Sequence, residues 1–151
     1  MVRDHLERIP QFAFPTGFDL RWYQSGDEAH WLRIHLDADR LNLITPELFK
    51  QQFGTASDLL QQRQCYLLFG KEPIGTATAW FNDAFRGKPY GRVHWVAILP
   101  KFQGRGLSKP LMTTICERLR ELGHERAYLT TSAERVAAIH LYQRFGFVSV
   151  D

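Results

Sequence analysis

Apolar residues in this chain recur with two periods, and together these predict alternating strands and helices. Apolar runs and period-two patterns bounded by turn residues predict strands at residues 18–24, 64–69, 74–81, 92–99, 127–131 and 147–150. Helical spacing and start signals predict helices from Ser25, Thr45 and Ser57, and two more over 107–122 and 133–145. Residues 82–91 are rich in Asn, Asp, Gly and Pro, which predicts a loop.

This order of elements predicts an α/β or α+β fold around one mixed sheet. A chain of 151 residues has the usual size of a single domain, so we expect residues 1–151 to form one. Cys65 and Cys116 lie in apolar segments without zinc-ligand spacing. We therefore expect two buried, reduced thiols and no metal.

Charge and hydropathy disfavour two classes of partner. The formal net charge is +3, and the densest run of cations, residues 118–126, is interleaved with glutamates, which is typical of a solvated helix face. We therefore expect no nucleic-acid partner. The first ten residues are charged, and no apolar run of 18 residues occurs, so we expect neither a signal peptide nor a membrane span. These features predict a cytoplasmic protein.

The most informative segment is the run from Gln103 to Ser108, which reads QGRGLS and lies between a strand and a long helix. Glycines allow successive backbone N–H groups to converge, and the helix dipole adds positive charge, so the segment suits a phosphate or pyrophosphate. Arg105 within this segment and Lys109 directly after it are candidate phosphate partners. Neither a Walker A loop nor a Rossmann fingerprint occurs here. A simple connecting turn remains the alternative.

With these residues the chain resembles the GNAT superfamily of N-acetyltransferases. The run QGRGLS matches the family's acyl-CoA motif, with Ser108 in place of a small Gly or Ala. A second block, Leu141 to Phe147, matches the family's Leu-Tyr-x-x-x-Gly-Phe signature. The motifs support the resemblance from Gln64 to Asp151. It implies a three-layer fold with helices on both faces of a mixed sheet and a V-shaped splay between two parallel strands.

The resemblance further implies acetyl-CoA as co-substrate and no metal. Its pyrophosphate would be held by a continuous run of backbone amides, with Lys109 beside them: Gln103, Gly104, Arg105, Gly106, Leu107 and Ser108. The backbone of Ile98 would pair with the pantetheine arm, and its N–H would polarise the thioester carbonyl.

The catalytic roles that the resemblance implies fall on Tyr142, His94 and Ile98. Tyr142 would protonate the departing CoA thiolate, and the alternative is a packing residue. Where many members of the family carry a Glu base, this chain has Arg92. His94, which strand alternation places on the same face, is the candidate base. A polar residue lining the sheet, a water relay or Asp83 are the alternatives.

The resemblance implies that the acceptor is a primary amine of a small molecule or a protein, which the sequence does not identify. In the family it is bound by segments that correspond here to residues 35–53, 82–91 and those beyond Phe147. The printed sequence stops soon after Phe147, so either the chain is shortened or a neighbouring subunit completes the sheet, and a homodimer is one expectation. A non-catalytic acyl-CoA sensor is the competing hypothesis, because the Glu is missing.

Overall fold

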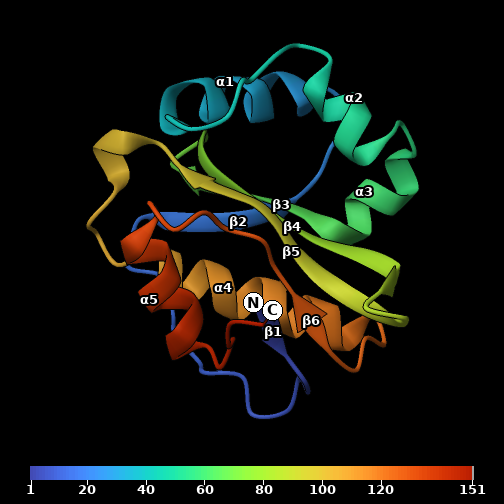
Figure 1. Ribbon diagram of the computed structural model, residues 1–151. Coiled ribbons are helices and arrows are strands. Elements are labelled where there is room, and N and C mark those ends of the chain that lie inside the picture. The colour runs from blue at the N-terminus through green and yellow to red at the C-terminus, as the bar shows by residue number, and fades with distance from the viewer. Residues whose placement is uncertain (151) are drawn as a thin grey trace. The chain divides into compact units, whose positions relative to one another are not determined.

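The computed structural model describes residues 1–150 and contains a mixed, open, six-stranded sheet of order β1-β6-β5-β4-β3-β2 (Figure 1). Strands β5 and β6 pair in parallel, whereas β1 with β6 and β2 with β3 pair antiparallel. The predicted α+β fold class is confirmed. The elements are β1 Val2–Arg3, β2 Phe18–Trp22, α1 Glu28–Ala38, α2 Leu48–Phe53, α3 Ser57–Arg63, β3 Gln64–Phe69, β4 Glu72–Phe85, β5 Lys88–Ile98, a 3₁₀ turn Pro100–Phe102, α4 Ser108–Glu121, β6 Ala127–Tyr128 and α5 Val136–Arg144.

The chain divides into two compact units. The first unit contains residues 1–13, 78–94 and the chain from 108 onward, and the second unit contains residues 14–77 and 95–107. Strands β4 and β5 each begin in one unit and end in the other, so the division falls within strands rather than at a linker. Whether the whole chain behaves as one domain stays a prediction.

In the second unit, α3 packs with strands β2 and β3, and α1 packs with α2. Trp31 and Ile34 of α1, Leu60 of α3 and Tyr66 of β3 are fully buried. The start of α1 is anchored by Asp27, whose carboxylate accepts two hydrogen bonds from Arg21, at 2.6 and 2.9 Å, and one from the N–H of Gln24 at 2.7 Å. A bidentate, charge-assisted pair of this kind fixes the approach of the chain to the helix.

The predicted helix starts are wrong by two or three residues in three cases. Helix α1 begins at Glu28 rather than at Ser25, α2 begins at Leu48 beyond Pro46, and α5 begins at Val136 with Arg135 before it. None of these helices has a side-chain cap hydrogen bond. The capping residues seen in the sequence therefore do not set these boundaries.

The core of the first unit is formed by α4 and the segment after α5. One face of α4 is fully buried, as the helical spacing predicts, through Leu111, Met112, Ile115, Cys116 and Leu119. Both cysteines are buried, which confirms this part of the prediction. Burial raises the pKa of the Cys116 thiol to about 12, so it is neutral and acts as an apolar group.

Val2 and Arg3 form a strand, β1, that the sequence pattern did not reveal. Val2 pairs with Tyr128 and Arg3 with Ala127 on β6, and Val2 also forms an antiparallel bridge with Val148 (Figure 1). The predicted strand at 147–150 is reduced to that bridge, and the predicted strand at 127–131 is reduced to β6. In the described chain, N-terminal residues thus occupy the edge of β6.

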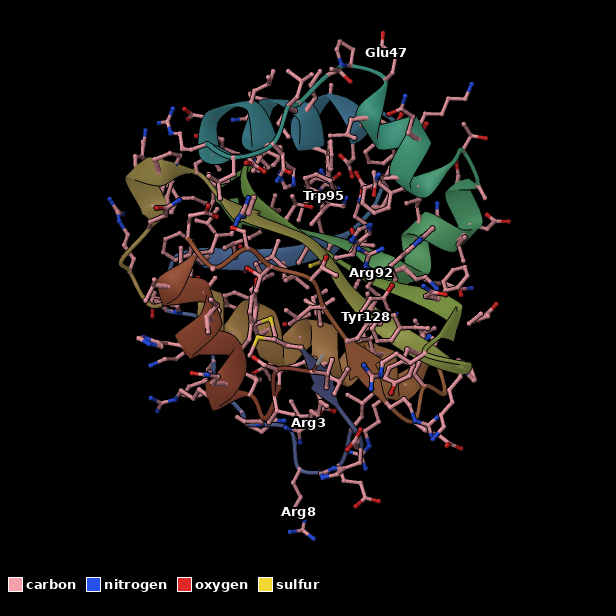
Figure 2. The ribbon with its side chains drawn as sticks, viewed as in Figure 1. Arg3, Arg8, Glu47, Arg92, Trp95 and Tyr128 are labelled. Carbon is pink, nitrogen blue, oxygen red and sulfur yellow. The ribbon has the colours of Figure 1, made fainter. Side chains whose placement is uncertain are left out.

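Arg3 holds this N-terminal segment in place. Its side chain is buried, and its guanidinium donates hydrogen bonds to the backbone carbonyls of Phe145, His5 and Glu7 (Figure 2). Gly146 follows directly, with φ +84°, and a methyl group added there would overlap Nη1 of Arg3. Gly146 is therefore required both by the left-handed backbone and by the approach of the guanidinium.

The predicted loop over residues 82–91 is wrong, because a continuous hairpin occupies these positions. Strand β4 extends to Phe85 and β5 starts at Lys88, so only Arg86 and Gly87 form the turn. Their φ values are +52° and +79°, as a type I′ turn requires. The ring of Phe85 stacks on Tyr128 of β6 at a centroid distance of 3.7 Å. This tertiary contact outweighs the turn-forming composition.

Candidate active site

The glycine turn that the sequence singled out lies in the second unit, directly before α4. Gly104 and Gly106 have φ values of +75° and +76°, and both are exposed. A Cβ added at either glycine would meet no atom within 4 Å. The backbone conformation, and not crowding by the protein, therefore requires glycine here, and the space beside the turn is open.

A side-chain hydrogen bond ties this turn to the end of strand β5. Nε2 of Gln103 donates to the backbone carbonyl of Ile98 at 2.9 Å. The side chain of Ile98 is buried and lies over Gly75 of β4, where an added Cβ would come within 3.3 Å of its Cγ1. Two of the predicted cofactor-binding residues, Gln103 and Ile98, are thus brought together, whereas the sequence placed them five residues apart without a contact.

The cations of the turn lie over an aromatic ring. The Arg105 guanidinium and the Lys101 ammonium lie 4.9 and 5.5 Å from the ring centroid of Phe102. Phe102 is buried and packs against Phe18 and Phe69. Cation–π contacts hold both charges at this turn, since the ring face attracts them.

Helix α4 continues the chain from the turn into the first unit. Ser108 is its first residue, and the 14-residue helix places the positive end of its dipole at Ser108. Leu107 is buried, while Ser108 and Lys109 are half-buried. The Lys109 ammonium lies 5.5 Å from the ring centroid of Phe12, and the Arg144 guanidinium is 5.6 Å from the same ring.

Arg92, at the position of the missing Glu, links β5 to β6 (Figure 2). Its guanidinium is 5.2 Å from the ring centroid of Tyr128, and Nη2 donates to Oγ1 of Thr130 at 3.3 Å. The parallel pairing of the two strands joins Gly91 with Ala127 and Arg92 with Tyr128. Arg92 therefore serves as a contact to the neighbouring strand.

The alternation assumed for His94 does not continue through the strand. His94 is buried in the first unit, but the next residue, Trp95, has φ +50°, which interrupts the extended backbone of β5. Strict alternation from Arg92 to Ile98 therefore fails at Trp95, because it requires every residue between them to be extended. Arg92 and His94 both precede the break, so alternation still places these two on one face of the strand. It no longer relates His94 to Ile98.

Trp95 belongs to an aromatic cluster of the second unit that sequence reasoning missed. Its ring packs edge-on against Trp31 at 5.5 Å and against His35 at 5.3 Å, beneath α1 and α2 (Figure 2). Its Nε1–H donates to Oε1 of Gln52 at 3.0 Å. Phe49 packs edge-on against Trp31 at 5.4 Å. The apolar spacing in residues 31–53 indicates a core here, but nothing in the sequence indicates the left-handed backbone conformation of Trp95.

Tyr142 lies on α5 in the first unit. Burial raises the pKa of its phenol, while the charge of Arg135 acts in the opposite direction. The hydroxyl therefore stays protonated at neutral pH, as a proton donor must. His140, two residues earlier on the same helix, is exposed.

The sequence profile of the acetyltransferase (GNAT) family matches residues 2–147 of this chain. The chain belongs to the GNAT family. A mycothiol acetyltransferase of Geodermatophilus obscurus is 31% identical over 91% of the chain and 47% of its own length. The chain spans about half the length of the curated relatives that it matches over its whole extent.

Solved GNAT structures agree in fold. A GCN5-related N-acetyltransferase of Sphaerobacter thermophilus has a TM-score of 0.78 at 18% identity, over 96% of this chain and 46% of its own. An aminoglycoside N-acetyltransferase in complex with CoA has a TM-score of 0.68 at 19% identity, over 92% and 94%. At these identities the likeness concerns the fold alone.

The residues that the sequence predicts for the site are distributed over both units of this GNAT chain. The second unit holds Ile98 and the glycine turn, and the first holds His94, Tyr142 and the start of α4 at Ser108. Among residues 1–150 no group of three or more His, Cys, Asp or Glu side chains is arranged to hold a metal ion. In the same range, no helix combines the length and apolar character that crossing a membrane demands.

Proposed function

We propose that this chain catalyses transfer of an acetyl group from acetyl-CoA to a primary amine of a small molecule or protein. The observation that carries the proposal is the open left-handed glycine turn, bound to the end of β5 through Gln103 and Ile98 and followed at once by α4. Family membership supports it, as do relatives that are named acetyltransferases and a neighbour solved with CoA.

In the proposed reaction the neutral amine nitrogen attacks the thioester carbonyl carbon in a ternary complex. A C–N bond forms and the C–S bond breaks, which releases an N-acetyl product and CoA. The Ile98 N–H is assigned to the developing oxyanion, and the amides from Gln103 to Ser108, with Lys109, are assigned to the pyrophosphate.

The cytoplasmic location, the single domain and the homodimer remain predictions.

Two proton transfers complete the reaction. His94 takes the proton that the amine loses, and Tyr142 gives a proton to the departing CoA thiolate. The raised pKa of Tyr142 supports the second role, because the phenol keeps its proton up to alkaline pH. His94 lies two residues after Arg92 on β5. The Arg92 side chain connects this strand to Thr130 through a hydrogen bond.

A kinetic comparison tests these roles against the hypothesis of a non-catalytic sensor. Acetyl-CoA binding is measured by calorimetry, and CoA release is followed with a panel of amines. We expect Tyr142→Phe to lower kcat about 100-fold with little change in acetyl-CoA affinity. His94→Ala should lower the rate most below pH 8. Binding without turnover by the native chain would support the sensor, and unchanged kinetics in both variants would refute the assigned roles.

A further inference from the structure

The first unit contains a pocket of about 590 Å³. It is lined by the tip of the β4–β5 hairpin, the segment after β6, one residue of α5 and the segment after Phe147, including Phe85, Arg86, Thr130, Thr131, Ile139 and Ser149. Its volume lies in the range of small-molecule sites, which is about 300–1,000 Å³.

Two observations connect this pocket with the residues proposed for proton transfer. Ile139 precedes Tyr142 by three positions on α5, so the two side chains share one face of the helix. Thr130 accepts the hydrogen bond from Arg92, which lies two residues before His94 on β5. The pocket therefore adjoins the helix face of Tyr142 and the strand of His94 within one unit.

The chemistry of the pocket wall favours an anion. None of the described residues that line it is acidic, and Arg86 contributes a guanidinium. Three hydroxyl side chains line it as well, and Oγ1 of Thr131 is buried without a hydrogen-bond partner in the described chain. Glu134, close along the chain, is exposed and is absent from the pocket wall.

Arg86 is an unfavourable residue for its position in the hairpin turn. The two turn residues of a type I′ hairpin both need positive φ, and Asn or Gly suits the first of them best. Here the first is an arginine at φ +52°. Strained residues of this kind persist where surrounding structure holds them, and they cluster at functional sites.

We infer that this pocket receives the acceptor and selects an amine that also carries an anionic group, a carboxylate or a phosphate, which Arg86 and the hydroxyls bind. The inference rests on the proposed acetyl transfer. It disfavours polycationic acceptors, because such amines need carboxylates in the wall to offset the loss of hydration.

The first experiment uses matched acceptors and measures kcat/KM from CoA release. Leucine is compared with leucinamide, and glucosamine 6-phosphate with glucosamine, so that the two pairs distinguish a carboxylate from a phosphate. Spermidine represents the polycations. We expect the anionic member of at least one pair to exceed its neutral partner about tenfold or more, because a charge-assisted hydrogen bond is lost in the neutral one.

The second experiment separates recognition from folding with Arg86→Asn. Asparagine favours the type I′ turn, so Tm should rise while the preference for the anionic acceptor falls about tenfold. Arg86→Lys should retain part of the preference. Arg8→Asn is the matched control, since Arg8 also has positive φ and is exposed, points away from the unit (Figure 2), and is absent from the pocket wall.

Each outcome decides the inference. Equal or better turnover of the neutral member in both pairs, or of spermidine, would overturn it, as would no turnover of any anionic acceptor by a protein that binds acetyl-CoA. An unchanged preference in Arg86→Asn would overturn the role of Arg86. If the native chain does not bind acetyl-CoA, the proposed function fails first, and the inference fails with it.

Discussion

Left-handed backbone is held in two different ways in this molecule. At the glycine turn, Gly104 and Gly106 have positive φ with open space around them. Glycine adopts this conformation at little cost, so the residue type itself indicates the turn in the sequence. At Trp95 and Arg86 bulky residues have the same sign of φ. Packing contacts must hold these two residues in the left-handed region of backbone conformation, because that region costs a non-glycine residue about 1–2 kcal/mol of conformational free energy.

The contrast separates two kinds of functional position. The glycine turn leaves room for a ligand against its backbone, and a motif search finds it. The strained residues place particular side chains, an indole among aromatic rings and a guanidinium at a pocket, and no motif marks them. Substitutions at Gly106, at Gly146 and at Trp95 test this comparison, in order of decreasing effect.

The largest effect is expected at the open turn, where Gly106→Trp fills the space proposed for the pyrophosphate. We expect acetyl-CoA affinity to fall at least about 100-fold, or about 2.7 kcal/mol, in calorimetry. Gly54→Trp is the control, because Gly54 also has positive φ and no neighbour within 4 Å, but lies at the end of α2. Equal losses in both variants would place the cofactor elsewhere.

A crowded glycine should respond differently from an open one. Gly146→Ala and Gly104→Ala share the backbone strain of positive φ, but only the first methyl group meets Arg3, whose guanidinium is held by three backbone carbonyls. We expect Gly146→Ala to lower the free energy of unfolding by about 2 kcal/mol more than Gly104→Ala.

A double-mutant cycle locates the source of that difference. In an Arg3→Ala background the excess cost of Gly146→Ala should disappear in denaturant unfolding, because the overlapping group is gone. Persistence of the full difference would mean that Arg3 does not set the requirement for glycine.

The smallest effect concerns the strained tryptophan. Trp95→Ala and Trp95→Gly both delete the indole, with its contacts to Trp31 and His35 and its hydrogen bond to Gln52. Glycine relieves the positive φ and alanine does not, so Trp95→Gly should be about 1 kcal/mol more stable in denaturant unfolding. In a regular strand alanine is the more stable of the two, and that order here would contradict the strain.

By itself the sequence determined the family, the order of most elements and the glycine turn. It did so because these features are local: helical spacing marks the buried face of α4, and glycine residues mark positive φ at Gly104 and Gly106. It also placed the two buried cysteines correctly.

Only the tertiary structure decided the rest. The two-residue strand β1 exists through Tyr128, Ala127 and Val148, which are distant in the chain, and the hairpin over residues 82–91 is held by Phe85 against Tyr128. The left-handed backbone of Trp95, which breaks the alternation beyond His94, likewise has no local signature. Each depends on packing between distant segments, and such contacts override the intrinsic preferences that a sequence pattern records.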